Sequence, residues 1–242
     1  MKRVLLICLI LLLCFGCTSN GDATRILFIG NSYTYVNDLP KVFANLSKSG
    51  GRRVEVGREA EGGWTLSDHA GSAKTLEAIE SSEWDYVVLQ EQSQIPASRV
   101  FRESGMYPAT RALVAKIREV GAMPVLYLTP AHLDGWPDEG MDYATMQANI
   151  NSSYWSLARE LNVLVAPVGI AWQNAHGQNP ELALWQADYS HPDKQGTYLS
   201  ACVFYATIFH ESPVGLSYRG GLSKEIAEAL QTIASQTVLN TP

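Results

Sequence analysis

The stretch Ile26-Leu27-Phe28-Ile29-Gly30-Asn31-Ser32 decides how this chain of 242 residues is expected to fold. Its four apolar residues are continuous rather than alternating, which is typical of a strand buried on both faces of a parallel sheet. The strand runs directly into a turn that contains glycine. We therefore expect Ser32 to be exposed at the carboxyl edge of the sheet, where the ligand sites of such folds form.

Further apolar stretches of strand length follow, separated by segments with helical periodicity. After Asp142, apolar residues recur at steps of three and four, Gly121 ends another such pattern, and Ser223 is expected to cap a helix near the end of the chain. Alternating strands and helices imply right-handed crossovers, so the sequence predicts an α/β fold: a three-layer α/β/α sandwich with a five-stranded parallel sheet. The predicted strands are 26–29, 54–56, 86–89, 124–128 and 163–165.

Composition and motifs argue against several classes of function, namely nucleic-acid binding and chemistry that depends on a cofactor or a metal. The chain is 46% hydrophobic and 17% charged, as expected for one domain with a substantial core. Its net charge is -6 and its basic residues form no cluster beyond Arg52-Arg53, which argues against nucleic-acid binding. The sequence has no phosphate loop, no dinucleotide fingerprint and no paired-histidine motif, so we expect neither a cofactor nor a metal.

The chain begins like an exported protein. Lys2-Arg3 precedes an apolar run at 4–15, which is typical of a secretory signal and too short to span a membrane. Gly16-Cys17 resembles a bacterial lipobox, so we expect residues 1–16 to be a lipoprotein signal peptide and Cys17 to carry a lipid that anchors the protein to a membrane, in the periplasm or at the cell surface. Cleavage nearby by an ordinary signal peptidase is the alternative. A tether at 17–24 and one domain at 25–242 follow.

A candidate acid and base stand near the other end of the chain, in Asp188-Tyr189-Ser190-His191. A carboxylate three residues before a histidine can accept a hydrogen bond from Nδ1–H and leave Nε2 free to deprotonate a hydroxyl. Asp193 is an alternative acid, although its spacing suits the turn less well.

Three further residues are candidates for binding a substrate. His132 follows the fourth predicted strand, while Trp64 and Trp136 lie in loops on the predicted ligand side, where an indole could stack on a sugar ring. For each of them a structural role, as an ordinary loop or core residue, is the alternative.

These motifs resemble those of the SGNH or GDSL hydrolases, which are esterases built on a flavodoxin-like sheet. Gly30-Asn31-Ser32 matches their nucleophile block, and Asp188 with His191 matches their last block. The resemblance implies that Ser32, His191 and Asp188 form a catalytic triad. It also implies an oxyanion hole made by the N–H groups of Ser32 and Gly63 and by the side-chain amide of Gln92.

The sequence departs from the usual pattern at three positions. Asn31 stands in place of aspartate, Tyr33 in place of leucine, and Gln92 in place of asparagine. The last change keeps the amide donor on a stem that is one methylene longer. The Gly-Asn-Ser-Tyr-Thr and Leu-Gln-Glu-Gln-Ser runs look most like a Bacteroidetes branch of the superfamily.

The resemblance implies an exported serine esterase that hydrolyses acyl esters, most simply O-acetyl esters of carbohydrates, through an acyl-enzyme. A lysophospholipase or thioesterase of the same fold is one alternative, and a catalytically inactive glycan-binding surface lipoprotein is another. An ordinary α/β-hydrolase is excluded because Thr34 occupies the second glycine position of the Gly-x-Ser-x-Gly motif.

Overall fold

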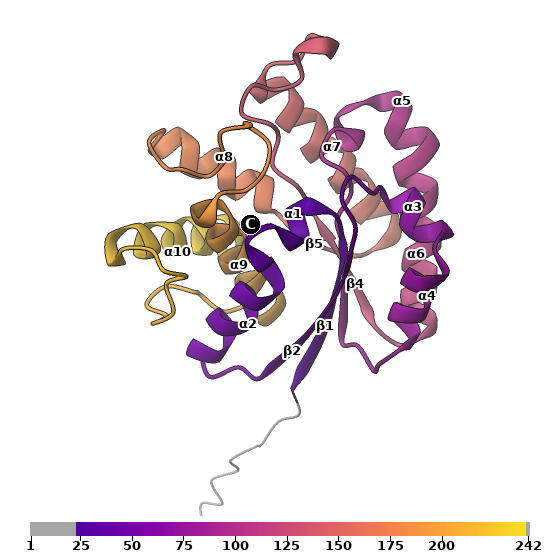
Figure 1. Cartoon of the computed structure of the whole chain (residues 1–242), viewed down its shortest axis with the longest axis horizontal. Coiled ribbons are helices and arrows are strands. Elements are labelled where there is room, and N and C mark those ends of the chain that lie inside the picture. The colour runs from indigo at the N-terminus through magenta and orange to yellow at the C-terminus, as the bar shows by residue number, and fades with distance from the viewer. Residues whose placement is uncertain (1–22, 241–242) are drawn as a thin grey trace, which may run out of the picture.

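Five parallel strands form a single sheet in the order β2-β1-β3-β4-β5 in the computed structural model, which describes residues 23–240 (Figure 1). This is the strand order of flavodoxin-like sheets, so the predicted α/β/α fold is confirmed. The strands are β1 Thr24–Gly30, β2 Val54–Ala60, β3 Tyr86–Leu89, β4 Met123–Tyr127 and β5 Leu164–Ala166.

The edge strand β2 is longer than its apolar run predicts. It pairs with β1 along its whole length, from Thr24 opposite Val54 to Gly30 opposite Ala60. Backbone hydrogen bonds do not require apolar side chains, so the ladder continues past residue 56, where the predicted strand ended. The extension carries β2 to the sheet edge at which β1 ends.

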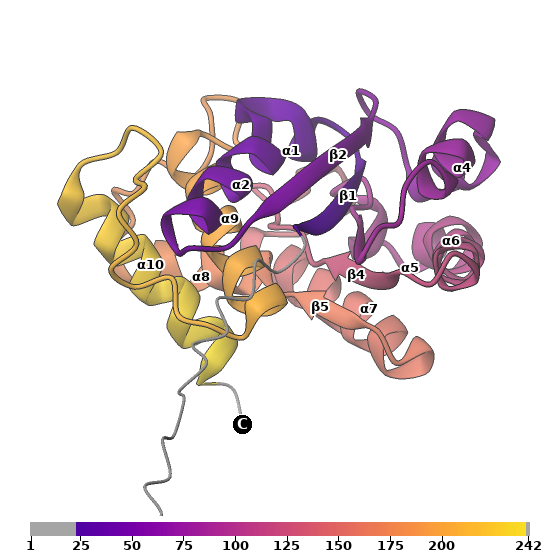
Figure 2. The same ribbon diagram turned by 90° about the horizontal axis from the view of Figure 1, so that it is seen from below.

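Helices cover both faces of the sheet (Figures 1 and 2). Helices α2, α8, α9 and α10 bury one apolar cluster against it, and α3, α4, α6 and α7 bury another on the opposite face. The helices are α1 Ser32–Tyr35, α2 Leu39–Ser49, α3 Leu66–Gly71, α4 Ala73–Glu80, α5 Arg99–Phe101, α6 Tyr107–Glu119, α7 Tyr143–Leu161, α8 Val168–Gln178, α9 Lys194–Phe209 and α10 Lys224–Leu239.

The predicted helix ends are those of the structure. Asp142 caps α7 by accepting a hydrogen bond of 2.8 Å from the Thr145 N–H. Ser223 caps α10 through the Ile226 N–H at 3.3 Å, and Gly121, at a φ of 82°, follows the end of α6. Cys202 is fully buried in α9.

The predicted signal peptide 1–16 and Cys17 lie outside the described residues, as does all but the last part of the tether. Among residues 23–240, no helix is long and apolar enough to cross a membrane. Thr24 opens β1 at the end of the sheet opposite to Ser32, which follows the same strand.

Candidate active site

The turn after β1 places Ser32 at the start of a helix. Asn31 accepts a hydrogen bond of 3.2 Å from the Tyr33 N–H through its side-chain oxygen and so caps the one-turn helix α1. Helix α2 begins at Leu39, and the Asn31 cap starts a separate helix of one turn directly after the strand. Ser32 is thereby held at the carboxyl edge of the sheet, as expected.

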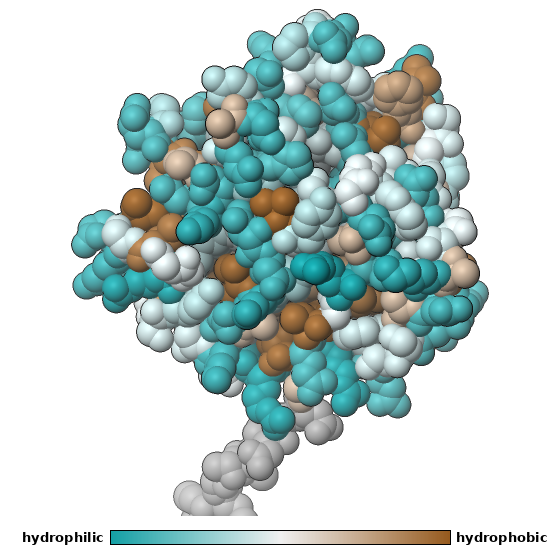
Figure 3. Space-filling view, viewed as in Figure 1, coloured by the Kyte–Doolittle hydropathy of each residue, from teal (hydrophilic) through white to brown (hydrophobic). Residues whose placement is uncertain are grey.

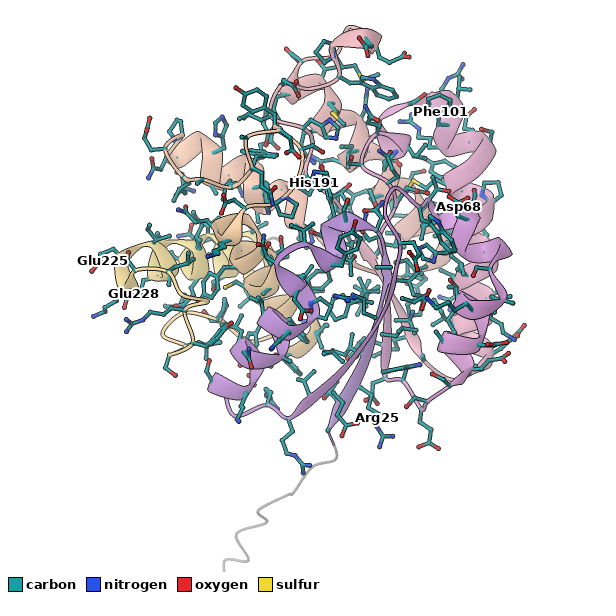
Figure 4. The ribbon with its side chains drawn as sticks, viewed as in Figure 1. Arg25, Asp68, Phe101, His191, Glu225 and Glu228 are labelled. Carbon is teal, nitrogen blue, oxygen red and sulfur yellow. The ribbon has the colours of Figure 1, made fainter. Side chains whose placement is uncertain are left out.

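Residues from the two ends of the domain meet at this edge. The Nε2 atom of His191 lies 2.9 Å from Ser32 Oγ, and its Nδ1 atom lies 2.5 Å from Asp188 Oδ2. Figure 4 labels His191 near the middle of the view, well above Arg25, which lies close to the start of β1. The side chains of His191 and Asp188 are 37% and 48% exposed, so the arrangement faces solvent.

The turn that carries the acid and the base is fixed by the acid itself. Asp188 Oδ1 accepts hydrogen bonds from the backbone N–H groups of Ser190, at 3.0 Å, and His191, at 2.9 Å. Tyr189 takes a left-handed conformation, with a φ of 61°, which lets the turn close. Partial burial acts to raise the pKa of Asp188, but its hydrogen bonds from the His191 ring and from these N–H groups outweigh burial and lower it.

Asp193, the alternative acid, has a different role. Its carboxylate accepts a hydrogen bond from the Lys194 N–H and caps α9. Of the two candidate acids, it is Asp188 that bonds the imidazole of His191, through Nδ1.

A cavity of about 280 Å³ opens beside Ser32. We call it the catalytic cavity after the predicted triad. It is lined by Asn31, Ser32, Gly63, Gln92, Ser93, His132, Ser190 and His191, together with Tyr33, Tyr35 and Gly62. Its lining comes from five separate loops, and three of these carry Ser32, Gly63 and Gln92, the residues predicted to form the oxyanion hole.

The predicted oxyanion donors are available for a ligand. Within residues 23–240, the N–H groups of Ser32 and Gly63 have no hydrogen-bond partner. The Gln92 side chain is oriented by its own loop, since Oε1 accepts from the Gln94 N–H at 2.8 Å and from the Ile95 N–H at 3.3 Å. Two backbone donors fix the oxygen, so Nε2 is the donor end of the amide. It donates to Gln94 Oε1 at 3.4 Å, and its second hydrogen remains for a ligand in the cavity that Gln92 lines.

Two buried amide side chains, those of Asn31 and Gln90, bond one another beside the predicted nucleophile. The sequence motifs indicated Asn31 but not Gln90. Gln90 Oε1 accepts from the Asn31 N–H at 2.8 Å and from Thr34 Oγ1 at 2.9 Å, while Gln90 Nε2 donates to Asn31 Oδ1 at 2.9 Å. Asn31 Nδ2 donates in turn to the Trp64 carbonyl at 2.9 Å. A carboxylate could not make this last bond, which explains the asparagine. Strands β1 and β3 are neighbours in the sheet, with Ile29 opposite Leu89, so residues 31 and 90 emerge side by side. This pairing could have indicated Gln90.

A chain of hydroxyl and imidazole groups lines the other side of the cavity. His132 Nε2 lies 3.0 Å from Ser190 Oγ and 2.8 Å from Ser93 Oγ, and Ser190 Oγ lies 3.1 Å from the Tyr33 hydroxyl. Burial raises the pKa of Tyr33 to about 12 and lowers the pKa of His132, so both groups are kept neutral. His132 thus lines the cavity as predicted, while Ser93 and Ser190 were not foreseen.

The two predicted tryptophans are not among the residues that line the catalytic cavity. Trp64 packs edge-on against the buried His69, with ring centroids 5.0 Å apart. Trp136 stacks on Phe101, with ring centroids 6.3 Å apart, and Phe101 and its neighbour Val100 are exposed. Figure 4 labels Phe101 at the upper right, where Figure 3 shows hydrophobic surface. Their part in substrate binding stays a prediction.

Among residues 23–240, no group of three or more histidine, cysteine, aspartate or glutamate side chains could hold a metal ion.

Comparison by sequence finds no match to a protein-family model and none to a curated protein. Comparison of structures finds many. A protein from Slackia heliotrinireducens, assigned to the SGNH hydrolases, is 29% identical with a TM-score of 0.68, over 77% of this chain and 100% of the other. A DUF4886 family protein from Bacteroides uniformis is 20% identical with a TM-score of 0.79, over 90% and 95% of the two chains.

A variant of an acetyl-xylooligosaccharide esterase from Geobacillus also shares the fold. It is 18% identical with a TM-score of 0.62, over 79% of this chain and 96% of the other. These matches extend over nearly the whole length of each solved structure, so the similarity is one of entire domains.

Proposed function

The chain belongs to the SGNH/GDSL hydrolase superfamily, and on that basis we propose that it is a serine esterase in which Ser32 is the nucleophile. The observation that carries the proposal is the distance of 2.9 Å between Ser32 Oγ and His191 Nε2. A hydroxyl and an imidazole at this distance can exchange a proton directly.

The first half of the reaction follows from this geometry. His191 Nε2 takes the hydroxyl proton as Ser32 Oγ attacks the carbonyl carbon of the ester, and Asp188 stabilises the imidazolium through Nδ1–H. The tetrahedral intermediate collapses, the bond to the alkoxy oxygen breaks, and His191 gives its proton to the departing alcohol. An acyl group remains on Ser32.

The second half regenerates the enzyme. His191 Nε2 deprotonates a water molecule that attacks the acyl carbonyl, and collapse of the second intermediate returns the proton to Ser32 Oγ and releases the carboxylic acid. The exposure of His191, at 37% of its side chain, leaves room for that water.

Negative charge develops on the carbonyl oxygen in both halves. We assign its stabilisation to the N–H groups of Ser32 and Gly63 and to Gln92 Nε2, because all three residues line the catalytic cavity and both backbone donors are free within residues 23–240.

For the substrate we propose short acyl esters of carbohydrates, with acetyl as the acyl group. The cavity of about 280 Å³ is small, and the residues that line it include no leucine, isoleucine, valine or phenylalanine in the described part of the chain. A lysophospholipase or thioesterase needs an apolar groove for a long acyl chain. The fold shared with an acetyl-xylooligosaccharide esterase supports the same choice.

We also propose that the protein is exported and held at a membrane by a lipid on Cys17. The sequence pattern at residues 1–17 supports this proposal. Metabolic labelling with a clickable fatty acid should mark the wild-type protein, whereas Cys17→Ser should remain unlabelled. Labelling that persists in Cys17→Ser would contradict it.

A fluorophosphonate probe tests the proposed activity. We expect it to label Ser32 in the wild-type protein and to leave Ser32→Ala unlabelled. Acetate release from acetylated polysaccharides, compared with hydrolysis of long-chain esters, then tests the substrate class. An unlabelled wild-type protein that binds glycans would instead indicate a catalytically inactive binding protein.

A further inference from the structure

Glu91 is a buried carboxyl group that the mechanism above does not use. It lies two residues after the end of β3, and its side chain is fully buried. Its Oε1 atom accepts a hydrogen bond from the Gln92 N–H at 2.7 Å and another from the Leu66 N–H at 3.1 Å. Its Oε2 atom is buried without a hydrogen-bond partner among residues 23–240.

The two N–H groups that bond Glu91 belong to the two segments that carry the Gly63 and Gln92 oxyanion donors. Gln92 supplies the side-chain amide, and Leu66 opens α3 three residues after Gly63. These segments follow different strands, β2 and β3, which are separated in the sheet by β1. A single oxygen atom therefore joins the loop that holds Gly63 to the residue that holds the amide.

Other hydrogen bonds near the cavity connect these two segments to the turn after β1, but among residues 23–240 none of them connects the segments to each other. Asn31 Nδ2 bonds the Trp64 carbonyl, which ties the Gly63 loop to the nucleophile turn. Gln90 Nε2 bonds the Glu91 carbonyl, which ties the end of β3 to the same turn. The bond between the Gly63 loop and the Gln92 backbone is made by the Glu91 carboxyl.

We propose that Glu91 is a positioning residue that sets the separation between the Gly63 N–H and the Gln92 amide, and so aligns both donors with the developing oxyanion. This inference rests on the proposed esterase function. Oxyanion donors act only when they are held at the place where charge develops, and a misplacement of about 1 Å can cost about 100-fold in rate.

If Glu91 positions the oxyanion donors, its protonation state should make the rate of hydrolysis depend on pH. Burial raises the pKa of Glu91 to about 8, against the opposing effect of its two backbone hydrogen bonds, and the nearby Asp68 carboxylate raises it further. The Tyr154 hydroxyl of α7, itself kept neutral by burial, also lies close to Glu91. Ionisation at alkaline pH would place a buried negative charge behind the oxyanion donors and oppose the transition state.

The test compares Glu91→Gln, which keeps the accepting oxygen, with Glu91→Ala, which removes it. Hydrolysis of 4-nitrophenyl acetate is followed from pH 6 to 10, and the melting temperature of each variant is measured alongside. Gln231→Ala is the matched control. Gln231 is buried in the opposite helical layer, where its side chain bonds Gly215, Leu216 and Tyr198, so this variant loses a comparable hydrogen-bonding side chain far from the cavity.

We expect Glu91→Ala to lower kcat by about 10- to 100-fold at pH 7 with KM changed less than about threefold, and Glu91→Gln to stay within about threefold of the wild type. The wild-type kcat should fall above about pH 8, and this decline should be missing from Glu91→Gln. Gln231→Ala should lose stability but keep its kcat.

An unchanged kcat in Glu91→Ala, or the same alkaline decline in Glu91→Gln as in the wild type, would overturn this inference alone. If Glu91→Ala does not fold, the pH profile of Glu91→Gln decides. A wild-type protein that neither hydrolyses the ester nor reacts with a fluorophosphonate would overturn the proposed function, and this inference with it.

Discussion

Ser32 Oγ and His191 Nε2 lie 2.9 Å apart although 159 positions separate the two residues in the chain. Ser32 follows β1 directly and so lies at the carboxyl edge of the sheet, where the ligand sites of such folds form. The turn that carries His191 follows α8 and not a strand. The Leu133 N–H, in the loop after β4, donates a hydrogen bond of 2.8 Å to the Tyr189 carbonyl and so holds this turn at the same edge.

Asp188→Asn should lower kcat by about 1000-fold or more. The amide would present a donor as readily as an acceptor to the imidazole and would favour the wrong tautomer of His191. Asp193→Asn is the control, since asparagine can still cap α9, and its kcat should stay within about twofold of the wild type. Steady-state kinetics with a short-chain ester measures both. Equal losses in the two variants would contradict the assignment of the acid.

Gln92→Ala should lower kcat by about 100- to 1000-fold, as expected for the loss of one oxyanion donor. The loss should appear in kcat more than in KM, because the donor acts on charge that develops in the transition state. Gln94→Ala removes only a contact of 3.4 Å to the Gln92 amide and serves as the control. A normal kcat in Gln92→Ala would show that this amide does not take the place of the usual asparagine.

Asn31→Asp restores the usual residue of the superfamily, yet we expect it to be harmful here. The new carboxylate could not donate to the Trp64 carbonyl and would lie close to that oxygen. The cost should be about 1 to 3 kcal/mol in the free energy of unfolding, with a lower kcat as the Gly63 loop loosens. Denaturant titration and steady-state kinetics provide the two readouts. A variant as stable and active as the wild type would mean that the bond contributes nothing.

Stability should depend on pH through Glu91. Its pKa is about 8 in the folded protein, against an ordinary value of 4.5, so the folded state holds a proton that the unfolded state releases. The stabilisation is complete below about pH 4.5 and is lost as the pH rises through about 8. The change should be on the order of a few kcal/mol.

Urea titrations of the wild type and Glu91→Gln at pH 5, 7 and 9 would reveal this contribution. The difference in unfolding free energy between the two proteins should shift in favour of Glu91→Gln as the pH rises. A difference that does not vary with pH would contradict the raised pKa.

Periodicity predicted the strands and long helices well because it reflects burial, and burial drives their formation. It could not predict the last part of β2, where Arg58 and Glu59 continue the ladder through backbone bonds alone. It also missed α1, since a helix of one turn depends on the side-chain cap of Asn31 rather than on an apolar stripe.

The residues that meet at Ser32 could be proposed from motifs, since each follows a strand or lies in a recognisable block. The buried residues that hold these site residues in place could not be predicted from motifs. Gln90 and Glu91 are polar residues in a run that reads as exposed loop, yet both are fully buried because they satisfy backbone donors of neighbouring segments. Such roles depend on which loops become neighbours, and the strand order decides that.

The seven residues of β1 separate Thr24 from the nucleophile turn, which corresponds to roughly 23 Å at the usual rise of a strand. A protein fastened by Cys17 would therefore hold its reactive hydroxyl on the far side of the domain from its own bilayer. Such an enzyme would meet acyl esters on soluble glycans or on polysaccharides that extend away from the membrane.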